Sequence, residues 1–218
     1  MSQLGADMWV LQQFSQAGFF LDVGCGDGLS ELSNSLLLEQ NGWRGLCIDA
    51  FPRNFSTRTN SIVVQAVLYS EKDKNVEFIV PHFSNDFLGN NFAGITNNDF
   101  GGIARELGLH KEVVTRNAKD IVTLKTSLLH ELLETYKAPS FMEYMNLDIE
   151  GSEYEVLRTF PFERYRFGCI SLEHNFEEPK RTAMEKLLLK HKYIKVREVE
   201  FDDWYVFMPP QKLPMVCV

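Results

Sequence analysis

The chain has 218 residues, of which 44% are hydrophobic and 24% are charged, and its formal net charge is −8. This length and composition predict a single globular domain over residues 1–218 and argue against disorder. The negative charge argues against a non-specific grip on nucleic acid or on an anionic membrane, so a small-molecule partner fits better.

The four cysteines show neither a disulfide pattern nor a metal-binding pattern. No C-x-x-C pair occurs, and three of them lie in apolar runs, which predicts buried free thiols and a reducing compartment. The N-terminal stretch "MSQLGADMWVLQQFSQAG" has no basic region, and polar residues interrupt its apolar positions. It is therefore predicted to be neither a signal peptide nor a membrane span, and we expect a cytoplasmic protein.

The first third of the chain alternates between strand and helix patterns. A short N-terminal helix is predicted within residues 1–16, followed by a buried strand over 18–24, which is an apolar run that ends in glycine. A helix is predicted over 29–42, a second buried strand over 45–50 and a third over 61–69. This order is typical of an α/β fold with a mostly parallel sheet and right-handed crossovers.

Residues 70–126 depart from this alternation. We interpret them as an insertion that covers the site where an acceptor substrate would bind. Their irregular part, residues 82–119, is rich in Asn, Gly and aromatic residues. Loops over the carboxyl edge of such a sheet commonly carry specificity. The aromatic residues of this part form either a wall for a sugar or another ring, or a satellite hydrophobic cluster: Phe83, Phe87, Phe92 and Phe100.

Regular alternation returns after the insertion. Helices are predicted over 127–138, 152–160 and 179–192, with strands over 141–149 and 167–175 between them. Two final strands, over 193–201 and 204–208, are separated only by Asp202 and Asp203, which indicates a hairpin turn. The sheet is therefore expected to end in an antiparallel pair.

The stretch "FFLDVGCGDGLS" carries the strongest binding signal. Gly24, Gly26 and Gly28 follow the first strand, where glycines allow a tight turn and a close approach of the backbone to a ligand. A helix starting there would offer free N–H groups to an anionic group. Asp49 ends the second strand, at the place where an acid accepts the hydroxyls of a ribose. The predicted ligand contains adenosine.

Two adenosine ligands fit such a turn, a dinucleotide or S-adenosylmethionine. The dinucleotide fingerprint G-x-G-x-x-G requires glycine at position 29, where this chain has Leu29. Asp22, just before the glycines, is a poor neighbour for a pyrophosphate and a natural acceptor for an ammonium group. These features favour S-adenosylmethionine.

The sequence resembles the FkbM-type methyltransferases in "SQLGADMWVLQQF", in the glycine stretch through "GLCIDAFPRNF", in "YMNLDIEGSEYEVLRTFPFERY" and in "ISLEHNF". The resemblance implies the Rossmann-like class I methyltransferase fold with a seven-stranded sheet, S-adenosylmethionine as cofactor, and O-methylation of a hydroxyl on a saccharide or small metabolite. It also implies that Asp148 lies near the transferred methyl group. We assign eight residues to the cofactor pocket: Asp22, Gly24, Cys25, Gly26, Gly28, Asp49, Ala66 and Asp148.

Candidate catalytic groups follow the fourth and fifth strands. A hydroxyl acceptor has to lose a proton, and a carboxylate or a histidine is suited to take it. Asp148 follows one strand, and Glu173 and His174 end the next, so all three are candidates. His174 is either such a base or a hydrogen-bonded structural residue. In the following helix, Ser152 and Glu155 have the spacing of a capping box.

The same strand ends suggest a metal site. Asp148, Glu173 and Asn175 would supply three oxygen ligands, a set that suits Mg²⁺ or Ca²⁺. Such an ion would acidify the acceptor hydroxyl.

Two other functions remain open. The first is 2′-O-methylation of RNA, but neither "LDIEGSE" nor "SLEHN" supplies a lysine between the strand-end acids, and the net charge argues against a phosphate track. The second is a non-catalytic module that binds an adenosine ligand; the presence of Asp148 and Glu173 argues mildly against it.

Overall fold

The structure is a computed structural model that describes residues 2–29, 33–80, 102–103, 106 and 120–208. Its strands are β1 (Phe19–Val23), β2 (Arg44–Asp49), β3 (Ser61–Gln65), β4 (Val67–Leu68), β5 (Asn75–Val80), β6 (Gly102–Ile103), β7 (Asp120–Ser127), β8 (Phe141–Leu147), β9 (Arg166–Glu173), β10 (Tyr193–Val199) and β11 (Asp202–Phe207). Its helices are α1 (Ala6–Gln13), α2 (Leu36–Gln40), α4 (Leu129–Thr135), α5 (Glu153–Leu157) and α6 (Glu178–Lys190).

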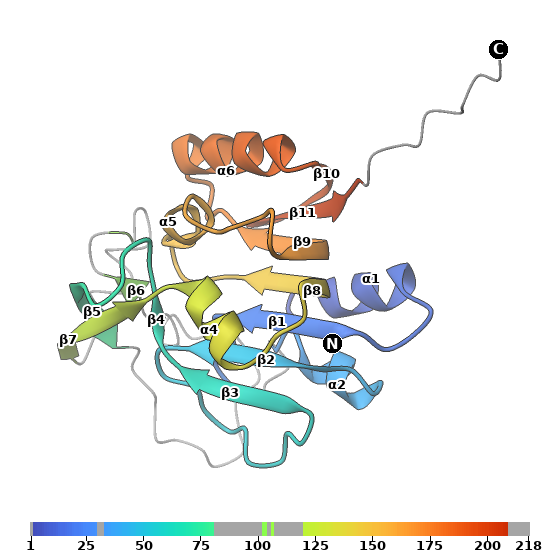
Figure 1. The fold of residues 1–218 in the computed structure, drawn as a ribbon, viewed down its shortest axis with the longest axis horizontal. Helices are drawn as coiled ribbons and strands as arrows, with labels where there is room; N and C mark the ends of the chain where they lie inside the picture. Colours follow the sequence, from blue (N-terminus) through green and yellow to red (C-terminus); the bar gives the residue numbers. More distant parts are fainter. Residues whose placement is uncertain (1, 30–32, 81–101, 104–105, 107–119, 209–218) are drawn as a thin grey trace.

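A seven-stranded sheet forms the centre of the molecule, in the order β10-β11-β9-β8-β1-β2-β3 (Figure 1). The five strands from β9 to β3 are parallel, whereas β11 is antiparallel to both β9 and β10. The apolar runs of β1, β8 and β9 account for their central places, since such strands are buried on both faces. The predicted α/β fold, with a mostly parallel sheet and a C-terminal antiparallel hairpin, is confirmed.

Helices cover both faces of this sheet, and each face has its own core. Leu21 and Val23 of β1 pack in a core that includes residues of α4, α5 and α6. Phe20, on the opposite face, packs in a core with residues of α1 and α2. Because side chains alternate along a strand, Asp22 also lies on the α1 and α2 face.

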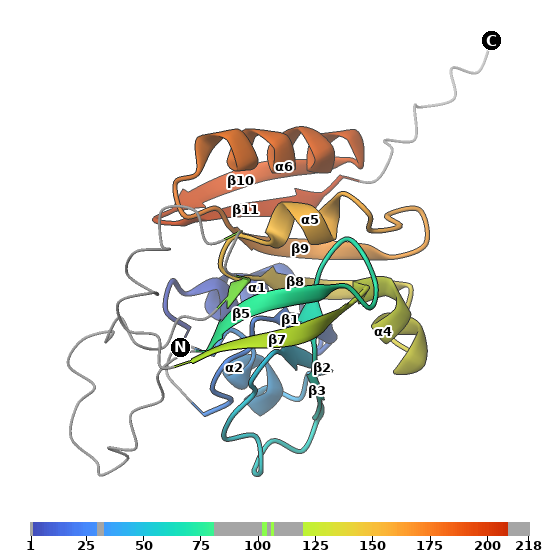
Figure 2. The same ribbon diagram turned by 90° about the vertical axis from the view of Figure 1, so that its left-hand side faces the viewer.

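A second sheet, in the order β4-β7-β5-β6, lies beyond the carboxyl ends of the parallel strands. The arrowheads of β1 and β8 point toward it in Figure 1, and Figure 2 shows β5 and β7 on that side. β5 and β7 pair antiparallel, and Phe78 of β5 packs against Phe51, with 5.7 Å between ring centroids. The single strand predicted over 61–69 is thus wrong, because β4 leaves the main sheet and pairs with β7.

Lys180 of α6 forms hydrogen bonds with both Glu106 and Gly151, which lies in the turn after β8. Its Nζ donates to the carbonyl oxygens of Glu106 and Gly151, at 2.9 Å in each case. The hydroxyl of Tyr69 also donates to Oε1 of Glu106 at 2.9 Å. The described part of the segment 70–126 therefore contacts the turn after β8.

Two local predictions are wrong. Among the described residues of the segment 29–42, only Leu36–Gln40 are α-helical. Ser33 Oγ accepts the N–H groups of Ser35 and Leu36 at 3.4 and 3.2 Å, so a serine turn precedes the helix. The final hairpin turns at Glu200 and Phe201 rather than at the two aspartates, because Asp202 and Asp203 already pair with β9.

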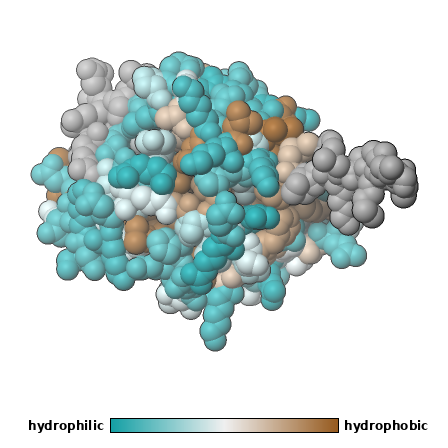
Figure 3. All heavy atoms as spheres, turned by 45° about the horizontal axis from the view of Figure 1, so that its top comes forward, coloured by the Kyte–Doolittle hydropathy of each residue, from teal (hydrophilic) through white to brown (hydrophobic). Residues whose placement is uncertain are grey.

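The face seen in Figure 3 is largely hydrophilic, with hydrophobic residues in smaller groups between. The exposed apolar residues of the described chain include Leu189 of α6 and Ile194 of β10. None of the helices in the described ranges combines the length and the apolar character that a bilayer crossing requires.

Candidate active site

The glycine turn after β1 lies directly against Asp148. Gly24 has a φ of 82°, in the left-handed region, and a Cβ atom placed on it would lie 1.6 Å from the carbonyl oxygen of Asp148. The N–H of Asp148 donates to the carbonyl of Val23 at 3.0 Å, which extends the β1–β8 pairing to the turn. Glycine is therefore required at position 24, and the predicted cofactor turn and Asp148 are neighbours.

Asp49 holds the other side of the same turn. Its Oδ2 accepts the N–H of Gly26 at 2.9 Å and its Oδ1 accepts the N–H of Phe51 at 2.7 Å. Burial raises the pKa of Asp49 despite these hydrogen bonds. The N–H of Ala66 donates to the backbone oxygen of Asp49 at 2.8 Å. The structure thus brings the predicted residues Gly26, Asp49 and Ala66 together.

Gly28 closes the turn against the loop that follows β2. A Cβ atom on Gly28 would lie 2.7 Å from the ring of Phe55, and its N–H donates to the carbonyl of Arg53 at 2.9 Å. The predicted helix does not start here, since α2 begins at Leu36. Contacts with the loop around Arg53 take the place that the sequence assigned to a helix N-terminus.

Asp22 is completely buried, with 0% of its surface exposed. Its Oδ2 accepts a hydrogen bond from Ser35 Oγ at 2.5 Å, and its Oδ1 accepts one from Asn146 Nδ2 at 3.1 Å. Burial raises the pKa of this carboxyl. These contacts favour a supporting role beneath the turn, and the contact with an ammonium group stays a prediction.

Cys25 is also buried within the turn, with 5% of its surface exposed. Burial raises the pKa of its thiol well above the usual range. A thiol in this state is neutral and weakly reactive, which suits a packing role at the predicted pocket.

Three carboxyl groups converge where β8 and β9 end. Oxygen atoms of Asp148, Glu150 and Glu173 all lie within 4.8 Å of one another. Burial, and then repulsion from neighbouring acids, raises the pKa of Asp148 and of Glu173 well above the ordinary range. The two side chains are hydrogen-bonded to each other, so this pair retains a proton at pH values where exposed carboxyl groups have lost theirs.

Two further acids border this acidic cluster, which we define as Asp148, Glu150 and Glu173. Burial raises the pKa of Glu153 and that of Asp202 to about 7 in each case. No sequence motif predicts a role for either residue. Glu153 falls in a helix and Asp202 in an expected turn, and only the sheet register, which pairs Asp202 with Glu173, brings the second one here.

Left-handed backbone conformations occur at both strand ends. Glu150 has a φ of 58°, and Asn175 and Phe176 have φ values of 46° and 58°. Glu150 and Phe176 are neither glycine nor asparagine, so their conformations are strained. Such strain concentrates at binding and catalytic sites.

Both nitrogens of His174 face the protein. Nδ1 accepts the N–H of Phe176 at 3.0 Å, and Nε2 lies 3.8 Å from Oδ1 of the buried Asp203. Burial lowers the pKa of His174. These contacts favour the structural alternative for His174, and its role as a base stays a prediction.

Two of the three predicted metal ligands lie in the acidic cluster. Asp148 and Glu173 belong to the acidic cluster, and Asn175 is buried two residues beyond Glu173. In the described residues the third convergent carboxylate is that of Glu150. The divalent ion stays a prediction.

The capping box predicted for α5 is wrong. Ser152 makes no capping hydrogen bond, and Glu155 instead accepts hydrogen bonds from Ser70 and Arg158. Oε1 of Glu153 accepts the N–H groups of Ile149 and Gly151 at 2.8 and 3.0 Å. Glu153 therefore stabilises the turn that presents Glu150.

Two surface hollows of the described residues lie away from the acidic cluster. Surface hollows of about 280 and 230 Å³ lie beside α2 and at the amino ends of β1 and β2, and the acidic cluster lines neither. The site is therefore defined by topology and contacts. The four aromatic residues predicted to form a wall lie outside the described residues: Phe83, Phe87, Phe92 and Phe100.

The strand order, the glycine turn and the acids at the neighbouring strand ends define a Rossmann-like methyltransferase fold. Residues 22–211 match the family described as methyltransferase FkbM domain. The chain belongs to this methyltransferase family. No curated protein and no solved structure matches the chain.

Proposed function

We propose that this protein is an S-adenosylmethionine-dependent O-methyltransferase that acts on a hydroxyl of a saccharide or small metabolite. The observation that carries the proposal is the contact between the glycine turn at Gly24 and Asp148, whose carboxyl belongs to the acidic cluster. A cofactor seated on the turn would have its reactive end beside groups that accept a proton.

In the proposed reaction, the acceptor oxygen attacks the methyl carbon of the sulfonium while the carbon–sulfur bond breaks. The products are the methyl ether, S-adenosylhomocysteine and a proton, which a carboxylate of the acidic cluster takes. The raised pKa of Asp148 and Glu173 supports this role, because a carboxylate with a raised pKa is a stronger proton acceptor. Alignment of the two reactants would contribute roughly 7 to 11 kcal/mol to the lowering of the barrier.

Asp49 supports the choice of an adenosine cofactor. Its carboxylate ends β2 beside Gly26 and Ala66 and keeps acceptor capacity for ribose hydroxyls beyond its two backbone hydrogen bonds. The free thiols Cys25, Cys47 and Cys169 support the expectation of a reducing, cytoplasmic compartment.

Calorimetric titration tests the cofactor. S-adenosylmethionine and S-adenosylhomocysteine should bind the protein, and NAD should not; failure of both sulfur compounds to bind would refute the proposal. Transfer of a labelled methyl group into a panel of oligosaccharides, small metabolites and RNAs tests the acceptor. Labelling of RNA alone would replace the proposed acceptor class.

A further inference from the structure

Arg58 lies in the loop between β2 and β3 and is buried, although no motif in the sequence includes it. Its Nε donates to Oε2 of Glu39 at 2.6 Å, and its Nη1 donates to the carbonyl oxygen of Gly28 at 2.9 Å. Its Nη2 donates to the hydroxyl oxygens of Ser35 and Ser61, each at 3.1 Å. One guanidinium thus joins α2, β3 and the glycine turn.

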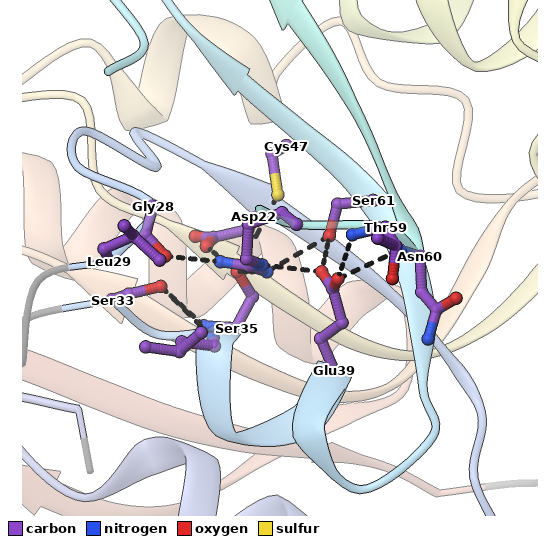
Figure 4. Close-up of polar contacts among 12 residues, drawn as sticks. Asp22, Gly28, Leu29, Ser33, Ser35, Glu39, Cys47, Thr59, Asn60 and Ser61 are labelled. Atoms are coloured by element: carbon purple, nitrogen blue, oxygen red, sulfur yellow. Dashed lines mark hydrogen bonds and ion pairs between the residues drawn. The ribbon is translucent and has the colours of Figure 1, made fainter. Parts of the chain in front are cut away.

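Glu39 of α2 fixes the position of this guanidinium. Its Oε1 accepts the N–H groups of Thr59 and Asn60 at 2.7 and 2.9 Å, and its Oε2 accepts Ser61 Oγ as well as Arg58. Burial raises the pKa of Glu39, but the hydrogen bonds outweigh burial and hold it below its usual value. Glu39 is therefore charged and binds the Arg58 side chain. It also binds the loop that carries Arg58, and Figure 4 shows Glu39 bonded to Thr59, Asn60 and Ser61.

Ser35 connects this ion pair to Asp22. Its hydroxyl oxygen accepts from Arg58 and donates to Asp22 Oδ2. On the other side, Asp22 accepts from Asn146 of β8. The charge of Arg58 therefore supports the residue that lies directly before the glycine turn.

We propose that Arg58 is a positioning residue for the cofactor, which holds the glycine turn in its binding shape through the Gly28 carbonyl and through Ser35 and Asp22. This inference rests on the proposed function. A regular helix that starts at Gly28 would fix the turn by its own backbone hydrogen bonds. Gly28 and Leu29 lie in a turn instead, and in the described residues that follow them α2 begins at Leu36. Arg58 supports the turn from a loop that lies far away in the sequence.

The test compares Arg58→Lys with Arg181→Lys by calorimetric titration with S-adenosylhomocysteine. Arg181 of α6 is the control, because it donates two hydrogen bonds to the carboxylate of the buried Asp203, at 2.8 and 2.6 Å. No hydrogen bond of Arg181 in the described residues goes to the glycine turn. A lysine retains the positive charge but cannot reach all the partners of a guanidinium. Both variants should lose thermal stability, whereas only Arg58→Lys should lose affinity, by about tenfold or more.

A second readout separates positioning from general structure. In Arg58→Ala, added methylguanidinium should restore part of the affinity for S-adenosylhomocysteine, and it should not change the affinity of the wild type or of Arg181→Ala. If Arg58→Ala does not fold, Ser35→Ala serves instead. It keeps the Arg58–Glu39 pair and removes the hydroxyl that joins Arg58 to Asp22, so its affinity should fall about threefold or more.

The outcomes are distinguishable. Affinity of Arg58→Lys and of Ser35→Ala within twofold of the wild type would overturn the role of Arg58 and leave the proposed function intact. Absence of binding by the wild type would overturn the proposed function and, with it, this inference.

Discussion

The carboxyl groups of Asp148 and Glu173 share a hydrogen bond where two neighbouring parallel strands end. Burial and mutual repulsion raise the pKa of both, so the pair holds a proton that exposed acids would release. The first prediction concerns this pair. Turnover of the wild type should rise with pH as the pair loses its proton. Asp148→Asn should lower turnover about 10²- to 10⁴-fold and weaken this pH dependence.

Affinity for S-adenosylhomocysteine provides the control for Asp148→Asn. It should stay within a few-fold of the wild-type value, because the backbone of Asp148, rather than its side chain, contacts Gly24. Loss of binding with no separate effect on turnover would show that Asp148 belongs to the cofactor pocket alone.

The second prediction concerns stability against pH at Asp202. Burial raises its folded-state pKa from 3.8 to about 7, so its protonated form is the stable one in the folded protein. The stability that protonated Asp202 contributes to the folded protein is fully present below pH 3.8 and is lost as the pH rises toward 7. Asp202→Asn should therefore gain stability relative to the wild type by roughly 1 kcal/mol per pH unit across this interval.

Urea unfolding at several pH values measures this difference. Asp73→Asn is the control, because Asp73 is exposed in a turn. A constant difference between Asp202→Asn and the wild type at all pH values would contradict the prediction.

The third prediction compares two glycines of the turn. Gly24→Ala should abolish both binding and stable folding, since its Cβ would lie 1.6 Å from a backbone oxygen. A Cβ on Gly26 meets no atom within 4 Å, and only its φ of 47° opposes the change. Gly26→Ala should fold, lose about 1 kcal/mol of stability and bind S-adenosylmethionine more weakly, because the methyl group would occupy space above the turn.

Circular dichroism and titration together check this pair of variants. Normal cofactor affinity in Gly26→Ala would show that the ligand does not pass over Gly26, and a folded Gly24→Ala would show that the β8 turn can move.

The fourth prediction concerns a divalent cation at the strand ends. If Asp148, Glu173 and Asn175 hold Mg²⁺ or Ca²⁺, EDTA should abolish turnover and added metal should restore it. Unchanged turnover in EDTA would leave a carboxylate of the acidic cluster as the sole proton acceptor. Glu150→Gln distinguishes the ligand sets, because it should weaken metal affinity only if Glu150 replaces Asn175.

The main sheet could be predicted because its strands are continuous apolar runs, and the burial of Phe20, Leu21 and Val23 follows directly from that pattern. The strand ends could be predicted for the same reason, so Asp148 and Glu173 were identified as neighbours. The proton that the two carboxyl groups share could not be predicted. It depends on how deeply they are buried and on the nearby Asp202, which belongs to β11, the strand that lies between β9 and β10 in the sheet.

The start of α2 and the role of Arg58 could not be predicted from the sequence, because both depend on hydrogen bonds of individual side chains. The run "SELSNS" contains Ser33, whose hydroxyl oxygen accepts the N–H groups of Ser35 and Leu36 just before α2 begins. Apolar spacing alone does not show this signal. Arg58 carried no sequence signal, because its partners Gly28 and Glu39 lie in other segments and only the folded chain brings them together.

The polar side chains aligned with Asp22 on the neighbouring strands limit which substitutions related sequences can carry. The register aligns Cys47, Asp22, Asn146 and Ser171 on four adjacent strands, and Ser171 donates to Asn146 at 2.7 Å while Asn146 donates to Asp22. Replacing Asn146 alone by an apolar residue would remove one hydrogen-bond partner from the buried Asp22 and one from the buried Ser171, at a cost of about 1–3 kcal/mol. Substitutions at Asn146 and Ser171 are therefore expected to occur together in related sequences.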